Sequence, residues 1–167
     1  TPAAHPSTAL KDYGMANRTS QPSCTGPAYD LAQRFVGTWQ EFTVTDEGEE
    51  LVGTLTSGFD LDGCVFIQRF RSVDEDFSFM SFGYVDQSSG QWLETYVFNN
   101  GRHAVYRWHS EGEEIITARI DGNPEDLRRL RIRFVSADLY EVSEERSTDG
   151  GGTWDHVELT RTRRVAN

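Results

Sequence analysis

The chain has 167 residues, enough for one domain with a sizeable core and too few for two ordinary ones. Its formal net charge of -11 argues against nucleic acid or an anionic membrane as a partner, because both need a positive surface on the protein. No apolar stretch is long enough to span a bilayer, and no signal peptide is present, so we expect a soluble protein, with a cytoplasmic location favoured over a secreted one.

The beginning of the chain is expected to be a flexible arm. Residues 1–28 are rich in Pro, Ser, Thr, Ala and Gly and carry no periodic apolar pattern. Residues 28–35 are compatible with one or two helical turns that lead into the first strand. We therefore divide the chain into an arm, residues 1–30, and one domain, residues 31–167.

From Phe35 onward, short β-rich segments alternate with turn residues, and no long helix is predicted. Ten such segments joined by tight turns predict an all-β fold, an antiparallel up-and-down β-barrel, with a β-sandwich as the main alternative. The expected strands are 35–45, 50–59, 63–72, 76–86, 91–99, 102–110, 113–121, 127–136, 138–147 and 153–165.

The pair Asn100-Gly101 lies between two of these segments and is the clearest turn of the chain. An Asn-Gly pair in this position is typical of a two-residue type I′ hairpin, because both central residues need positive φ. This register predicts the cross-strand pairs Phe98–His103, Tyr96–Val105, Glu94–Arg107 and Trp92–His109, all on one face. The simplest closure of the preceding turn, 86–90, adds Met80, Phe82 and Tyr84 to that face.

Two cysteines, Cys24 and Cys64, permit one disulfide between the arm and the barrel, and two free thiols are the alternative. No CxxC motif or His/Cys cluster indicates zinc, and no phosphate-binding loop is present. We therefore expect neither a metal nor a cofactor.

Four arginines alternate with apolar residues near the end of the chain, in the segment 128–134. This alternation predicts a half-buried strand whose arginines face water or the glutamates of a neighbouring strand, among them Glu141, Glu144 and Glu145.

Several short motifs resemble known families. Residues 147–154 fit the Asp box of sialidase-like hairpins, where Asp149 accepts backbone N–H groups; one copy indicates a stabilised hairpin. Residues 35–39 resemble the Gly-x-Trp opening of lipocalin-like barrels, in which the tryptophan, here Trp39, closes one end. Residues 61–68, 82–99 and again 147–154 are similar to motifs of an uncharacterised bacterial domain-of-unknown-function family. That resemblance implies a lipocalin-like, or calycin, barrel and no settled activity.

The resemblance also chooses a cavity face. Tyr84, Trp92 and Tyr96 correspond to signature positions of that family, and they share the face of Glu94 and Arg107. The alternative is a solvent-exposed Glu94–Arg107 pair on the outer wall. The expected ligand-binding residues are Trp39, Met80, Phe82, Tyr84, Trp92, Tyr96, Phe98 and His103, and the expected catalytic residues are Glu94, Arg107 and His109.

Three functions remain open. The first is binding of a small hydrophobic or aromatic molecule, oriented by Arg107 and Glu94. The second is a cofactor-independent cyclase or isomerase of a biosynthetic pathway, acting on a polyketide-like or polyene substrate, in which Arg107 pairs with a ligand carboxylate, enolate or phenolate and Glu94 or a histidine acts as base. The third is an interaction module with a filled core. A homodimer is compatible with all three.

Overall fold

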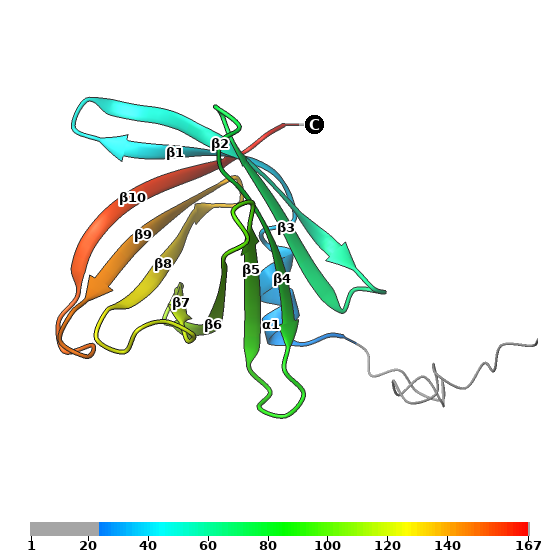
Figure 1. Cartoon of the computed structure of the whole chain (residues 1–167). Coiled ribbons are helices and arrows are strands. Elements are labelled where there is room, and N and C mark those ends of the chain that lie inside the picture. The colour runs from blue at the N-terminus through cyan, green and yellow to red at the C-terminus, as the bar shows by residue number, and fades with distance from the viewer. Residues whose placement is uncertain (1–23, 167) are drawn as a thin grey trace, which may run out of the picture.

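The computed structural model describes residues 24–166, and ten antiparallel strands in it form a closed up-and-down barrel (Figure 1). Each strand pairs with its neighbours in the chain, and β1 pairs with β10 to close the barrel. The expected all-β barrel is confirmed, and the sandwich alternative is wrong. The strands are β1 Gly37–Thr45, β2 Gly48–Asp60, β3 Val65–Ser72, β4 Ser78–Val85, β5 Trp92–Phe98, β6 His103–Glu111, β7 Glu114–Arg119, β8 Leu127–Ser136, β9 Leu139–Ser147 and β10 Asp155–Arg164.

A short helix, α1 (Pro27–Gln33), precedes β1 and lies across one end of the barrel (Figure 1). Pro27 begins the helix, where its missing N–H costs no hydrogen bond, and Asp30 in the first turn complements the helix dipole. The expected helical lead-in is confirmed, whereas residues 1–23 of the expected arm lie outside the described residues. Within residues 24–166, no helix has the length and apolar character needed to cross a membrane.

Phe35, two residues after α1, closes this end of the barrel from inside. Its ring is 2% exposed and lies 5.6 Å from the Trp108 ring, 4.9 Å from Phe134 and 5.2 Å from Tyr140, centroid to centroid. All three contacts are edge-on, the arrangement in which aromatic pairs add stability beyond the area they bury. We call Phe35 and α1 together the plug.

Trp39 and Arg164 fasten the plug to the barrel wall. The Trp39 indole Nε1 donates to the Phe35 carbonyl oxygen at 2.7 Å, and the Arg164 guanidinium carbon lies 4.0 Å from the centre of the Trp39 ring. Arg164 Nη1 donates to the Val36 carbonyl at 2.5 Å, and its Nε lies 3.0 Å from Asp138 Oδ1. Trp39 is fully buried and belongs to the closed end, as the Gly-x-Trp resemblance implies.

A disulfide joins Cys24 to Cys64, with the two Cα atoms 4.9 Å apart. Cys64 lies in the turn before β3, at the closed end of the barrel, and Cys24 lies three residues before α1. The Tyr29 hydroxyl of α1 donates to the Cys64 carbonyl at 3.4 Å. The plug is therefore held on its N-terminal side by the disulfide and on its C-terminal side by Trp39 and Arg164.

The β5–β6 hairpin differs from the expected two-residue turn. Phe98 donates through its N–H to the Arg102 carbonyl, and Gly101 donates to the Phe98 carbonyl, each at 2.9 Å, so the loop has three residues. Gly101 has φ 79°, whereas Asn100 is not among the described residues with positive φ, which is the pattern of a type I turn followed by a left-handed glycine. Trp92 consequently pairs with Trp108 and Glu94 with Tyr106, so the expected Glu94–Arg107 pair is wrong.

Replacing both cysteines with serine is expected to lower the free energy of unfolding by about 2–4 kcal/mol, because the bond closes a loop with a sequence separation of 40 residues. Urea denaturation followed by tryptophan fluorescence measures this change. Wild-type protein with a reductant serves as the matched comparison and should unfold with the variant; equal midpoints for the variant and the untreated wild type would contradict the prediction.

Candidate functional site

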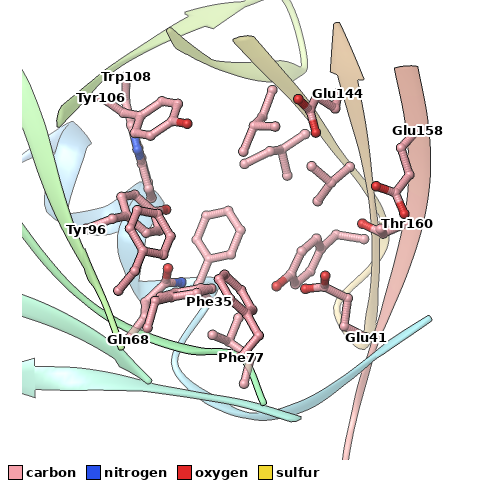
Figure 2. A pocket seen from close by; sticks show the side chains of 17 residues that line it. Phe35, Glu41, Gln68, Phe77, Tyr96, Tyr106, Trp108, Glu144, Glu158 and Thr160 are labelled. Carbon is pink, nitrogen blue, oxygen red and sulfur yellow. The ribbon is translucent and has the colours of Figure 1, made fainter. Parts of the chain in front are cut away.

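The barrel encloses a cavity of about 290 Å³ above the plug (Figure 2). Phe35 lies at its closed end, and the exposed side chains of Phe77 and Glu158 lie at its mouth. The residues that line it come from most of the strands: Phe35, Glu41, Leu55, Gln68, Phe77, Phe79, Tyr96, Phe98, Tyr106, Trp108, Leu130, Ile132, Tyr140, Val142, Glu144, Glu158 and Thr160.

One wall of the cavity is aromatic. Figure 2 shows Tyr96, Tyr106 and Trp108 together on one side, where β5 and β6 run antiparallel. The Tyr96 and Tyr106 rings meet edge to face with centroids 5.3 Å apart, and Phe79 of β4 lies 5.2 Å from Tyr96. These rings give the cavity a rigid apolar surface, the usual lining of a small-molecule site.

The opposite wall is acidic, with Glu41, Glu144 and Glu158 facing the aromatic rings (Figure 2). Glu144 Oε1 is paired with Arg128 Nη1 at 2.5 Å, and Glu158 Oε1 accepts a hydrogen bond from Thr43 Oγ1 at 2.9 Å.

Glu41 is the carboxylate of this wall with the fewest partners. Within residues 24–166 it forms no hydrogen bond or ion pair. Burial raises the pKa of Glu41 to about 7, and repulsion from Glu158 acts in the same direction.

A second carboxyl group, Glu94, is buried behind the aromatic wall and is 0% exposed. The Ser81 hydroxyl lies 2.5 Å from Glu94 Oε1 and 3.4 Å from Gln68 Oε1, although it has one hydrogen to donate. The contact with Glu94 is the shorter of the two, so Ser81 donates its hydrogen to Glu94.

Burial likewise raises the pKa of Glu94 to about 7, against smaller opposing effects of Ser81, Tyr96 and Trp108. Glu94 Oε2 and Trp108 Nε1 are buried without a hydrogen-bond partner among the described residues, so the pocket of Glu94 favours the neutral acid.

No arginine, lysine or histidine is among the described residues that line the cavity. Over the same part of the chain, residues 24–166, no three His, Cys, Asp or Glu side chains converge to hold a metal ion. Three of the four arginines of β8 point outward instead: Arg129 pairs with Glu145, Arg131 with Glu114, and Arg133 with Glu141, whereas Arg128 shares the inward face of Leu130 and pairs with Glu144. The alternation expected for this strand is confirmed.

Five of the residues expected in the site face the barrel interior. Tyr96 and Phe98 line the cavity, and Glu94 lies behind it. Trp39 and Trp92 are buried at the closed end, where Trp92 packs 5.3 Å from Tyr29 of α1.

The other six lie on the outer wall. Because the β5–β6 loop has three residues, His103, Arg107 and His109 alternate with inward Ala104, Tyr106 and Trp108 and are exposed. The β4–β5 register differs in the same way: Val85 pairs with Trp92, so Ser81 and Gly83 face inward while Met80, Phe82 and Tyr84 face outward. The expected place of these six in the cavity is wrong, and Arg107 contacts Gln91 instead, at 3.5 Å.

Sequence reasoning missed Phe35, Glu41, Tyr106 and Glu158. Glu41 could have been predicted, because it follows Trp39 by two residues and must share its face of β1. Tyr106 was hidden by the register of the hairpin, and Phe35 by its place before the strand.

No protein-family model matches this chain, and no curated protein matches it. The solved structure of the S-type phycobiliprotein lyase CPES from Guillardia theta superposes on it with a TM-score of 0.51, over 89% of this chain and 99% of that one. The fold is calycin-like. The two sequences are 13% identical, so the likeness concerns the fold alone, and the resemblance to the uncharacterised bacterial family stays a prediction.

Glu94→Gln is expected to gain stability relative to the wild type as the pH rises. The folded wild type keeps until about pH 7 a proton that the unfolded chain releases near 4.5, so its stability falls across that interval. Glutamine does not titrate, so the variant does not lose stability in this way. The free energy of unfolding of the variant relative to the wild type should therefore rise by about 3 kcal/mol between about pH 4 and pH 8. Urea denaturation across this range tests it.

The control for this prediction is Glu113→Gln, at an exposed position in the turn between β6 and β7. Its stability should follow the wild type at every pH. If the Glu94→Gln curve also runs parallel to the wild type, the carboxyl group is not held neutral by burial.

Proposed function

We propose that this calycin-like barrel binds a small hydrophobic or aromatic molecule in its central cavity. The observation that carries the proposal is a cavity of about 290 Å³ that is closed below by Phe35 and lined mainly by aromatic and aliphatic side chains. Concave sites of this size and polarity are typical of small-molecule binding, and a barrel that served only as an interaction module would be expected to fill its interior with side chains.

The polar groups that orient the ligand differ from those expected from the sequence. Arg107 lies on the outer wall and Glu94 is covered by the aromatic wall, so neither touches the ligand in this proposal. Glu41, Glu158 and the hydroxyl of Tyr106 take that role, because they are among the polar groups that line the cavity.

A second function, a cofactor-independent isomerase or cyclase, is favoured by one observation. A carboxylic acid with a pKa of about 7 has the balance of forms that general acid-base catalysis needs, and Glu94 has that pKa beside an aromatic cavity. Binding comes first in our proposal because Glu94 does not itself line the cavity, and Glu41, which does and has a similar pKa, faces no basic side chain among the described residues of the lining.

Filling the cavity is expected to abolish binding. Val142 lines the cavity, and Val142→Trp would occupy it, so the affinity for the neutral fluorescent probe N-phenylnaphthylamine should fall at least about tenfold, as expected for the loss of a well-packed contact. Fluorescence titration of the purified variant and wild type measures it.

The matched control is Val97→Trp, which adds the same side chain on the exposed outer face of β5. It should bind the probe like the wild type, and so should Arg107→Ala. Undiminished binding by a folded Val142→Trp protein would place the probe elsewhere and remove the support for a cavity ligand.

Native mass spectrometry of freshly purified protein detects a co-purified ligand, and NMR of the released ligand then separates the two functions, because isomerisation and cyclisation can leave the mass unchanged. The same molecular structure in the wild type and in Glu94→Gln supports a binding protein. Molecules that differ in structure between the two, substrate in the variant and product in the wild type, would favour the enzyme.

A further inference from the structure

The charged groups of the cavity all carry the same sign. Its lining includes three carboxylates and, among the described residues, no basic side chain. Arg128 neutralises Glu144, which leaves Glu41 and Glu158 without a cation. Such a pair in a concave site disfavours carboxylate, phosphate and enolate ligands by repulsion.

Glu41 is the less compensated member of this pair. It extends from β1 into the cavity (Figure 2), and no described residue forms an ion pair or hydrogen bond with it. Burying a carboxylate without a counter-charge is costly, so an incoming cation is the group that would stabilise it best.

The opposite wall is suited to the same kind of ligand. Tyr96, Tyr106 and Trp108 present aromatic rings to the cavity, and ring faces attract cations as well as apolar groups. Hard metal ions need several more oxygen ligands than these two carboxylates supply, which points to an organic cation.

We propose that the cavity is selective for a hydrophobic amine, whose ammonium group lies between Glu41 and Glu158 and whose apolar body packs against the aromatic wall and Phe35. This inference rests on the proposed binding function and specifies its ligand class. Glu158 is exposed at the mouth, so the ammonium end lies toward solvent and the apolar end toward the plug.

The affinity for an amine should depend on pH through Glu41. The titratable groups around it are Glu158 on β10 and Tyr140 and Glu144 on β9. In the empty barrel Glu41 is largely protonated below its pKa of about 7, and an alkyl amine stays charged through that range. Binding therefore strengthens from about pH 5 to about pH 8 and releases a proton from Glu41 at the lower end.

Isothermal titration calorimetry with three probes of the same ring system tests the proposal: naphthylmethylamine, naphthylmethanol and naphthoic acid. At about pH 8 the amine should bind about tenfold or more tightly than the alcohol, the effect of one charge-assisted hydrogen bond, and the acid should bind most weakly. In Glu41→Gln the preference for the amine over the alcohol should fall, because Glu158 alone remains, and its rise with pH should disappear, while the alcohol keeps its affinity.

Glu113→Gln is the control for the loss of one negative charge outside the cavity, and Glu158→Gln is the second variant should Glu41→Gln fail to fold. An alcohol or acid that binds the wild type as tightly as the amine overturns the inference and leaves the small-molecule function intact. Failure of the amine to bind also overturns it. The neutral fluorescent probe then decides separately whether the proposed function fails as well.

Discussion

The contact of Phe35 with Trp108, Phe134 and Tyr140 is the interaction on which the rest of the interior depends. It closes one end of a barrel that would otherwise be open to water at both, and it makes the floor of the cavity. Because water is excluded there, the carboxyl group of Glu94 behind the aromatic wall is driven toward its neutral form. The disulfide and Arg164 do not touch the cavity, yet they hold the helix that presents Phe35 to it.

The inner and outer surfaces of the barrel wall differ in how their charged side chains are paired. On β8 from Arg129 to Arg133, arginines and aliphatic residues alternate, and the pleat sends these arginines outward to glutamates of β7 and β9, as at Arg129 and Glu145. These outer pairs satisfy one another, whereas Glu41 and Glu158 line the cavity and form no ion pair within the part of the chain that the structure describes. The interior thus carries more carboxyl groups than a structural core requires. These groups give the acidic wall a different chemistry from that of the aromatic wall.

The strands, the helical lead-in before β1 and the arginine alternation could be predicted from the sequence, because each follows from local pattern. The lining of the cavity could not, because it depends on register. Asn100-Gly101 fits a two-residue type I′ turn and also a three-residue loop that ends in a left-handed glycine. The choice between them shifts β6 by one residue and exchanges Arg107 for Tyr106 inside the barrel. The inward face predicted for β5 was correct. For β4 and β6, the predicted inward and outward faces were each reversed.

Because of the plug, the cavity is open at one end only. Because Phe35 closes one end of the barrel, a ligand enters and leaves through the mouth that Phe77 and Glu158 border. The part of the ligand that enters first is the last to leave. The leading end is therefore protected from other proteins throughout, and the trailing end stays within their reach. A ligand bound as proposed would therefore be exchanged through this mouth without any strand of the closed barrel separating from its neighbour.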